Sequence, residues 1–403
     1  MKKQSNGKLI ISDYKEHICS FVFDAKGHAT QIYVDESRNE SIVGNIYVGK
    51  VDKIVKNINA AFIEFLPGTF GYFSLDTPFE PLFVNPDRKE GPLRKGDILL
   101  VQVAKDAIKS KEPVLTCDIT LTGKYTVLTL NKNALSFSNK FKDKEKKKEI
   151  RRRYNLLGEK KFGFIIRTNS EEADIEYIFE EIDFFSELIL MVKDSGIFSK
   201  PLNLVYKAPY SYMNFLRDGY DYLIKEIITD NKKIYADVKD FLEKFQPADI
   251  KKLKFYESDF PLCNLYSFDK QFRDALNKKI WLKSGGFIVI EPTESLVAID
   301  VNTGKYVSEK DSEEEYLKIN LEAAEEIARQ LLLRNLSGII IVDFINMKYV
   351  PSKAMLIDYL KSLAELDPVK TVIVDYTKLN LVEITRKKIR KPIYELIDLT
   401  MLQ

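Results

Sequence analysis

Leu296-Val297-Ala298-Ile299-Asp300 and Gly338-Ile339-Ile340-Ile341-Val342-Asp343 are two apolar runs in the last third of the chain, and each ends in an aspartate. Continuous Ile, Val and Leu runs of this length are typical of strands buried on both faces. A carboxylate there is costly unless it lies at a strand end, is paired or binds a metal. The two runs therefore predict an α/β domain with an acidic site at the carboxyl ends of its strands.

A helix is predicted between the two runs, because apolar residues recur there at helical spacing. A strand–helix–strand crossover places Asp300 and Asp343 on adjacent strands at the same end of the sheet. Asn302 lies two residues beyond Asp300, so both side chains point to the same face. Two carboxylates and a carboxamide suit Mg²⁺, which can activate water for attack on a phosphodiester. Spacing alone leaves open that both aspartates are structural.

The length and composition of the chain limit the number of domains and the kinds of chemistry to expect. A chain of 403 residues predicts roughly two to four domains. The 62 basic and 60 acidic residues nearly cancel, so binding to nucleic acid must come from local clusters of charge. Two histidines and three distant cysteines give no support for histidine-based chemistry, a zinc knuckle or a disulfide framework. Without a bilayer-spanning stretch or a secretory signal, we expect a cytoplasmic protein.

Five short strand-like runs with Gly and Pro between them predict an OB-type barrel. They are residues 46–51, 60–65, 71–75, 97–103 and 114–119. Phe62 and Tyr72 would lie on adjacent strands, and Lys105 and Lys111 flank a loop. Aromatic rings interleaved with lysines can stack bases and contact phosphates, although the pattern fits a core phenylalanine and solvated lysines equally well.

Arg167 and Thr168 follow an apolar run at residues 162–166. Glu172 comes three residues after Asn169, which predicts a capping box and a helix N-terminus beside the strand exit. A guanidinium, a hydroxyl and free backbone N–H groups at that position suit a phosphate. The dipeptide alone is weak support for this hypothesis.

Two segments that are far apart in the sequence are predicted to form one domain. Residues 1–36 alternate like an antiparallel meander that has no core of its own, and residues 211–279 read as mainly helical. We expect these helices to cover the meander, which makes one discontinuous domain.

Several motifs resemble the catalytic core of the bacterial ribonuclease E/G family. They are SGGFIVI at 284–290, AIDVNTG at 298–304, NLEAAEEIARQL at 320–331, IVDFI at 341–345 and TKLNLVEITRK at 377–387. The last is nearest to the ribonuclease G branch. Further matches are GNIY at 44–47, AAF at 60–62 and Arg167-Thr168. The resemblance spans nearly the whole chain.

The resemblance implies an α/β multidomain architecture. Its parts are an RNase H-like discontinuous domain (1–36 and 211–279), an OB-type RNA-binding barrel (37–118), a 5′-phosphate sensor (119–210) and a DNase I-like catalytic domain (280–403). The implied activity is a single-strand-specific endoribonuclease of rRNA processing and mRNA decay that leaves 5′-phosphate and 3′-hydroxyl ends.

The resemblance also assigns residues. Asp300 and Asp343 are implied as the ligands of a catalytic Mg²⁺, with Mn²⁺ left open, and Asn302 as the residue at the scissile phosphate. Arg167 and Thr168 resemble the 5′-monophosphate sensor. The barrel positions that resemble RNA contacts are Phe62, Tyr72, Lys105 and Lys111.

Three departures from the family pattern matter. Asn346 replaces a usual aspartate, and Tyr72 replaces a usual phenylalanine. The paired-cysteine zinc link is absent, so we expect no zinc; a homodimer stays open and a tetramer is not supported. The alternative function is a catalytically silent, ribosome-associated RNA-binding protein, and the presence of Asp300, Asn302 and Asp343 together favours the enzyme.

Overall fold

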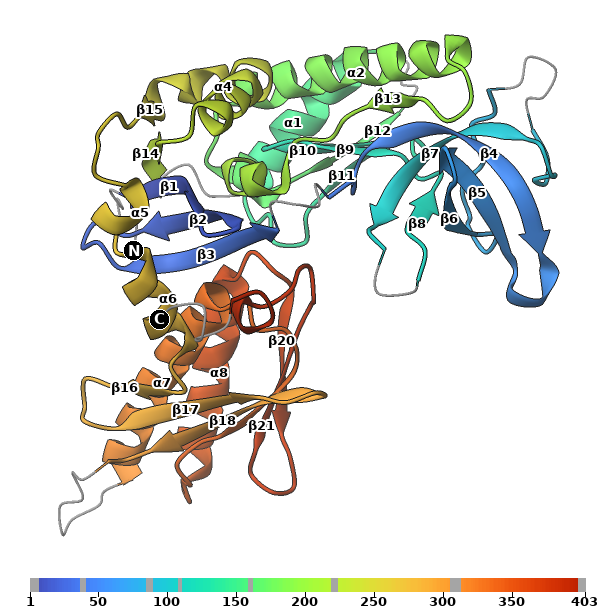
Figure 1. Ribbon diagram of the computed structural model, residues 1–403. Helices are drawn as coiled ribbons and strands as arrows, with labels where there is room; N and C mark the ends of the chain where they lie inside the picture. Colours follow the sequence, from blue (N-terminus) through green and yellow to red (C-terminus); the bar gives the residue numbers. More distant parts are fainter. Residues whose placement is uncertain are drawn as a thin grey trace. The chain divides into compact units, whose positions relative to one another are not determined.

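The computed structural model describes residues 7–36, 41–84, 90–107, 111–158, 162–218, 224–304 and 313–397. The chain divides into two compact units. The first comprises residues 1–37, 220–239 and 249–403, and the second comprises residues 38–219 and 240–248. Figure 1 labels the helices and strands of both units. In the described parts of the chain, no helix is long and apolar enough to cross a membrane.

One sheet of the first unit joins the N-terminal meander to two later strands. Its order is β15-β14-β1-β2-β3, with β1, β2 and β3 antiparallel and β1, β14 and β15 parallel. These strands are β1 (Gly7–Tyr14), β2 (His17–Phe23), β3 (Ala29–Glu36), β14 (Ile224–Thr229) and β15 (Leu253–Phe255). Helices α5 (Leu262–Leu265) and α6 (Phe268–Leu276) follow. Phe268 of α6 packs on Phe21 of β2, with 4.0 Å between ring centroids, so α6 covers this sheet.

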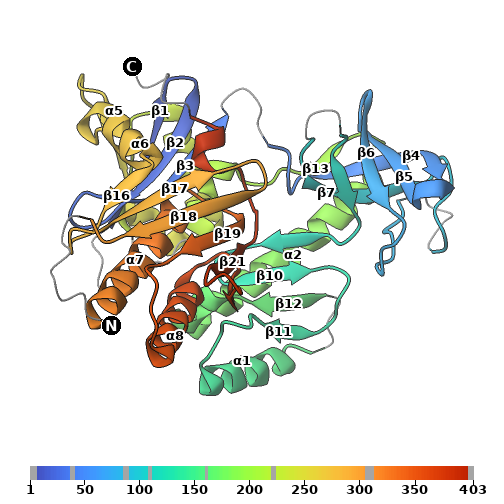
Figure 2. The ribbon, with the colours of Figure 1, turned by 90° about the horizontal axis from the view of Figure 1, so that it is seen from below.

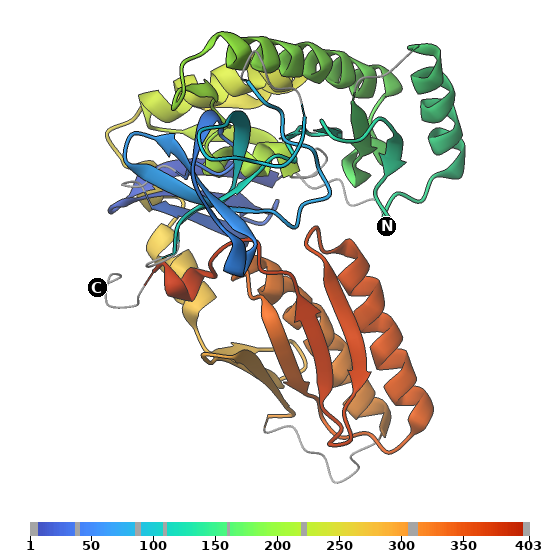
Figure 3. The ribbon, with the colours of Figure 1, turned by 90° about the vertical axis from the view of Figure 1, so that its right-hand side faces the viewer.

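The last third of the chain forms a second sheet in the same unit, in the order β16-β17-β18-β19-β21-β20. The strands are β16 (Lys279–Trp281), β17 (Phe287–Pro292), β18 (Leu296–Asn302), β19 (Gly338–Asp343), β20 (Thr371–Tyr376) and β21 (Val382–Arg386). Helices α7 (Glu313–Leu333) and α8 (Val350–Leu366) share one hydrophobic core with the sheet. Both helices lie on one face of it (Figures 2 and 3), so the other face is open.

The second unit contains a closed five-stranded barrel, as predicted. Pairing runs β4-β5-β6-β8-β7 and returns from β7 to β4, with β13 (Leu204–Tyr206) added beside β4. The barrel strands are β4 (Ile46–Val55), β5 (Ala60–Leu66), β6 (Thr69–Ser74), β7 (Ile98–Lys105) and β8 (Val114–Thr116). Alternate residues of β5 (Ala61, Ile63 and Phe65) are buried in the barrel core, as expected where every second residue points inward.

The rest of the second unit is a four-stranded sheet of order β11-β12-β10-β9 with helices. The strands are β9 (Thr120–Thr122), β10 (Thr126–Thr129), β11 (Leu135–Phe137) and β12 (Gly163–Ile166). The helices are α1 (Lys144–Leu156), α2 (Ile175–Phe198) and α3 (Asn214–Asp218). Helix α4 (Lys232–Phe245) begins in the first unit and ends in the second.

The structure confirms the mixed α/β class and the barrel. The expectation that residues 211–279 are mainly helical is confirmed, because helices and 3₁₀ turns occupy most of the described residues there, but it missed the strands β14 and β15. Both strands are short, and β14 pairs with β1, which lies more than 200 positions earlier in the sequence. A local pattern cannot reveal such a partner. The four domain boundaries stay a prediction.

A buried ion pair fixes the far edge of the second sheet. Arg386 of β21 donates from Nε to Oδ2 of Asp367 at 2.7 Å, and its side chain is 2% exposed. We expect Asp367→Asn to lower the free energy of unfolding by about 3–5 kcal/mol, because it leaves a buried guanidinium without its counter-charge. The control Glu291→Gln breaks the exposed pair with Lys278 and should cost no more than about 1 kcal/mol.

Urea unfolding followed by the fluorescence of Trp281 measures both changes, because this single tryptophan lies on β16 of the same sheet. Equal losses in the two variants would contradict the role given to the buried pair.

Candidate active site

Asp300 and Asp343 stand directly opposite each other on neighbouring parallel strands, Asp343 as the last residue of β19 and Asp300 two residues before the end of β18. The register of β18 and β19 pairs Ile299 with Val342 and Asp300 with Asp343. Ile299 and Val342 are buried against the helices, whereas both aspartates are exposed on the open face. Side chains opposite each other on neighbouring strands project from one face about 5 Å apart. The structure therefore brings the two predicted carboxylates together.

Asn302 joins this pair through a hydrogen bond. Its Nδ2 donates to Oδ2 of Asp300 at 2.7 Å, which orients the carboxylate. Among the described residues, no group of three or more His, Cys, Asp or Glu side chains could hold a metal ion. Two carboxylates with an amide nevertheless fit Mg²⁺, which commonly takes one or two protein carboxylates and keeps several waters.

Polar side chains of α7 fasten the loops around this end of the sheet. Asn320 is fully buried; its Nδ2 donates to the carbonyl of Ile345 at 2.8 Å, and its Oδ1 accepts from the Ile345 N–H at 3.0 Å. This holds the segment that follows Asp343. Glu322 accepts hydrogen bonds from the N–H groups of Lys283 and Ser284 at 2.6 and 3.1 Å, which holds the turn before β17.

Two glycines allow close contact between backbone segments next to Asp300 and Asn302. A Cβ on Gly304 would lie 2.2 Å from the carbonyl oxygen of Gly285, and Gly304 has φ +73°. A Cβ on Gly286 would lie 2.7 Å from the carbonyl oxygen of Asn302. The glycines in the two sequence motifs thus allow main chain to pack on main chain beside Asp300 and Asn302.

Arg167 leaves β12 and forms a cluster with α3. Its Nη2 donates to Oδ1 of Asp218 at 2.7 Å, and its Nη1 donates to the carbonyl oxygens of Gly123 and Arg217. Arg217 also binds Asp218, with Nη2 2.8 Å from Oδ2. Burial raises the pKa of Asp218, but Arg217 and Arg167 outweigh it and lower that pKa overall. Two guanidinium groups therefore share the carboxylate of Asp218.

Thr168 lies next to this cluster, and its Oγ1 is 3.0 Å from Oγ of Ser138. The predicted capping box is wrong. Residues Thr168–Glu171 form a 3₁₀ turn, and α2 begins only at Ile175. The carboxylate of Glu171, the last residue of the 3₁₀ turn, accepts hydrogen bonds from the backbone N–H groups of Lys142 and Asp143.

Glu181 of α2 holds the turn on which Arg167 rests. Its carboxylate accepts from the N–H groups of Lys124, Tyr125 and Thr126 at 2.6–2.9 Å and from Oγ1 of Thr126 at 2.9 Å. The carbonyl of Tyr125 in turn accepts from the N–H of Arg167 at 2.8 Å. Burial raises the pKa of Glu181, and these donors offset part of that rise.

The barrel brings three of its four predicted RNA contacts into one row. The register pairs Phe62 with Tyr72, Tyr72 with Val114 and Val114 with Lys105. The rings of Phe62 and Tyr72 are half-buried, with their centroids 6.3 Å apart. Lys111 lies outside this row, in the segment before β8, and is exposed.

Lys53 extends the row and was missed from the sequence. It pairs with Phe62 in the register, and its Nζ lies 4.9 Å from the Phe62 ring centroid. A register shift between Val51 and Lys53 interrupts the strand alternation that would have revealed this placement.

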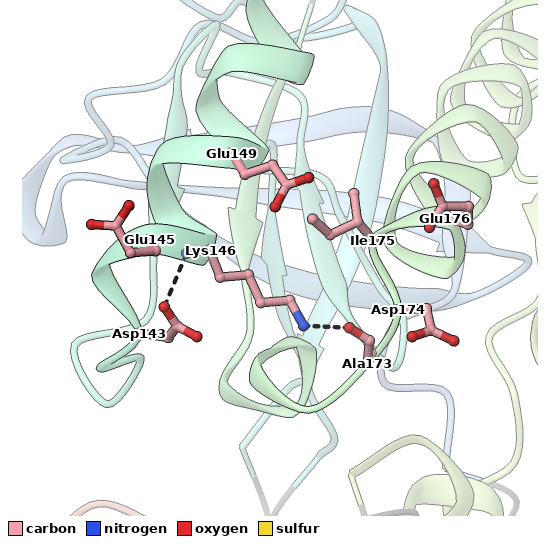
Figure 4. Close-up of a pocket in the computed structure, with 8 residues that line it drawn as sticks. All are labelled: Asp143, Glu145, Lys146, Glu149, Ala173, Asp174, Ile175 and Glu176. Carbon is pink, nitrogen blue, oxygen red and sulfur yellow. Dashed lines mark hydrogen bonds between the residues drawn. The ribbon is translucent and has the colours of Figure 1, made fainter.

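A surface pocket between α1 and the start of α2 belongs to none of these three candidate sites (Figure 4). Five of the eight residues that line it are Asp or Glu, and Lys146 donates to the carbonyl oxygen of Ala173. Its acidic lining disfavours a phosphate, and none of the predicted site residues lines it.

Comparison with known proteins shows extensive similarity. The sequence pattern of the Ribonuclease E/G family matches residues 120–389. Ribonuclease G of Haemophilus influenzae is 30% identical over 374 residues, which cover 91% of this chain and 76% of that protein. Ribonuclease G of Escherichia coli K12 is 29% identical over 376 residues, covering 91% and 77%. A ribonuclease E/G-like protein of Porphyra purpurea is 31% identical over 363 residues, covering 88% and 71%.

The contacts of Glu181 lead to a local prediction. In Glu181→Gln, the amide group presents donors to backbone donors, so at least one N–H loses its acceptor at a cost of about 1–3 kcal/mol. Hydrogen exchange measured by mass spectrometry should become faster at Lys124–Thr126 and stay unchanged in β4. The control Glu187→Gln changes an exposed residue of the same helix and should leave both segments unaffected. Unchanged exchange at Lys124–Thr126 in Glu181→Gln would show that Glu181 does not hold the turn.

Proposed function

Because this chain belongs to the ribonuclease E/G family, we propose that it cleaves single-stranded RNA by metal-assisted hydrolysis at Asp300 and Asp343. The family and its relatives named ribonuclease G identify an endoribonuclease of RNA processing, on the ribonuclease G branch. The observation that carries the finer proposal is the register of β18 and β19, which sets the two carboxylates side by side on an exposed face.

Each residue of this site has a distinct part. Asp300 and Asp343 would hold the cation, which supplies charge neutralisation at the phosphate and a more acidic bound water. The Nδ2 of Asn302 has two hydrogens; one binds Asp300, and the second can donate to a phosphate oxygen. A water oxygen forms a bond to phosphorus, the bond to the 3′ oxygen breaks, and that oxygen takes up a proton. The products carry 5′-phosphate and 3′-hydroxyl ends.

Arg167 and Thr168 form the proposed 5′-monophosphate sensor. The guanidinium group of Arg167 favours a dianionic terminal phosphate, and the Thr168 hydroxyl adds a hydrogen-bond donor. Asp218 and the Gly123 carbonyl fix the guanidinium before the phosphate arrives. A 5′-hydroxyl end has no charge to make this interaction.

The barrel row, together with Lys111 outside it, is a second proposed contact with RNA. Phe62 and Tyr72 offer half-buried rings to bases, while Lys53, Lys105 and Lys111 offer charges to the backbone. The strand order of the first sheet supports the RNase H-like assignment, and the sheet with two helices on one face supports the DNase I-like one.

Cleavage of a short, A/U-rich, 5′-monophosphorylated strand in the presence of Mg²⁺ tests the catalytic site. We expect Asp300→Asn and Asp343→Asn each to lower the rate by roughly a hundredfold or more, since each removes charge that stabilises the transition state. The control Asp375→Asn changes an exposed acid on β20 of the same sheet and should keep the rate.

RNA binding by the same variants, measured by filter retention, separates chemistry from misfolding. Cleavage at the wild-type rate by Asp300→Asn and Asp343→Asn would show that the metal assignment is wrong. Tight RNA binding without any cleavage by the wild-type chain would favour the silent RNA-binding protein instead.

The sensor gives a second prediction. Arg167→Ala should slow cleavage of 5′-monophosphorylated RNA to the rate seen with 5′-hydroxyl RNA, and should leave the 5′-hydroxyl rate unchanged. Arg153→Ala is the matched control, because it removes an arginine paired with Glu176 at the surface of the same unit. Equal losses on both substrates would remove the sensor role.

A further inference from the structure

A cluster of two aromatic rings and a lysine lies on the first two strands of the catalytic sheet. Trp281 is the only tryptophan of the chain and is 64% exposed on the edge strand β16. Its ring centroid lies 5.3 Å from that of Phe287 on β17, with the planes at 62°. The Nζ of Lys279 lies 4.1 Å from the Trp281 centroid and 3.6 Å from the Phe287 centroid.

The register places this cluster on the same face as the carboxylates. Trp281 pairs with Phe287, and Phe287 pairs with Asn302. In the next row, Lys279 pairs with Val289, and Val289 pairs with Asp300. Trp281 is therefore two strands, or about 10 Å, from Asn302 across the open face.

The packing of the sheet does not account for this arrangement. The core side of the same strands is filled by Ile280, Ile288 and Ile290, which share one core with α7 and α8. A large ring left mostly in water contributes little to that core. An exposed indole with a cation beside it provides a flat face for a base and a charge for a phosphate.

We propose that Trp281, Phe287 and Lys279 form a base-stacking subsite for an unpaired nucleotide next to the scissile phosphate. The subsite rests on the proposed catalytic role of Asp300, Asn302 and Asp343, because its use depends on RNA being cut there. Any base has a face to stack, so the subsite tolerates sequence. It selects against duplexes, since a paired base is already stacked between its neighbours and cannot lie on Trp281.

Because Trp281 is the single tryptophan, its fluorescence shows whether a base is stacked at the subsite. Titration of the wild-type chain in EDTA with a short unpaired oligoribonucleotide should quench Trp281 fluorescence. The same oligonucleotide made abasic beside the cleavage position should bind with less quenching, and a blunt duplex should leave the fluorescence unchanged. Binding of the unpaired strand, followed by anisotropy of a label on the RNA, without any change at Trp281 would overturn the subsite.

Cleavage kinetics of Trp281 variants give a second test of the subsite. Trp281→Ala should lower kcat/KM for the unpaired strand by about tenfold, the loss expected for one stacked base, while Trp281→Phe retains most of it. Phe260→Ala removes another exposed ring from the same unit, 53% exposed, and should change nothing. A loss in Trp281→Ala that Phe does not rescue, accompanied by a lower unfolding temperature, would assign the ring a structural role instead.

The two proposals fail differently. If Asp300→Asn and Asp343→Asn cut RNA as well as the wild type, the catalytic assignment fails whatever the fluorescence shows. If those variants are inactive but RNA binding leaves Trp281 fluorescence and Trp281→Ala kinetics unchanged, the catalytic site stands and the stacking subsite is wrong.

Discussion

The parallel pairing of β18 with β19 is the constraint on which the candidate active site depends. Ile299 and Val342, paired with each other, are buried against α7 and α8, so the aspartates that follow them must face outward together. A slip of one residue would turn each aspartate into the core and each apolar neighbour into water, at a large cost in free energy. Burial of apolar side chains on one face thus holds two like charges next to each other on the opposite face. Two carboxylates side by side on an exposed face are what the proposed metal-binding role requires.

Elements with strong local patterns could be predicted from the sequence. The five barrel strands and the two apolar runs before Asp300 and Asp343 alternate or stay apolar over enough residues to be recognised. β14 and β15 could not be predicted in this way, because they are short and depend on β1 for their place in the sheet. The cap after Arg167 failed for a related reason. Asn169, the predicted cap, lies inside a 3₁₀ turn, and its side-chain amide donates to the carbonyl oxygen of Arg217, 48 positions later, which the local pattern does not show.

In the candidate sites, too, residues placed by their sequence neighbours could be predicted, whereas residues placed by distant contacts could not. Asn302 could be placed with Asp300 because strand geometry puts residues two apart on one face. Lys53 and Trp281 could not be placed, since their positions follow from register across several strands rather than from neighbours in sequence. The three residues of β16 are too few to display an alternation. Glu181 reads from the sequence as one acid among several on α2, and only the fold shows that it binds the turn under Arg167.

Lys279 illustrates how a cation can lie in the same row as the two carboxylates without pairing with them. Lys279 occupies the same register row as Asp300 and Asp343, where a free ammonium could pair with a carboxylate and compete with a metal ion. Its Nζ instead lies over the rings of Phe287 and Trp281, at 3.6 and 4.1 Å from their centroids. The electron-rich ring faces stabilise the ammonium there. The aromatic pair therefore holds this positive charge at least two strands away from the aspartates, which is compatible with the proposed binding of a cation by the two carboxylates.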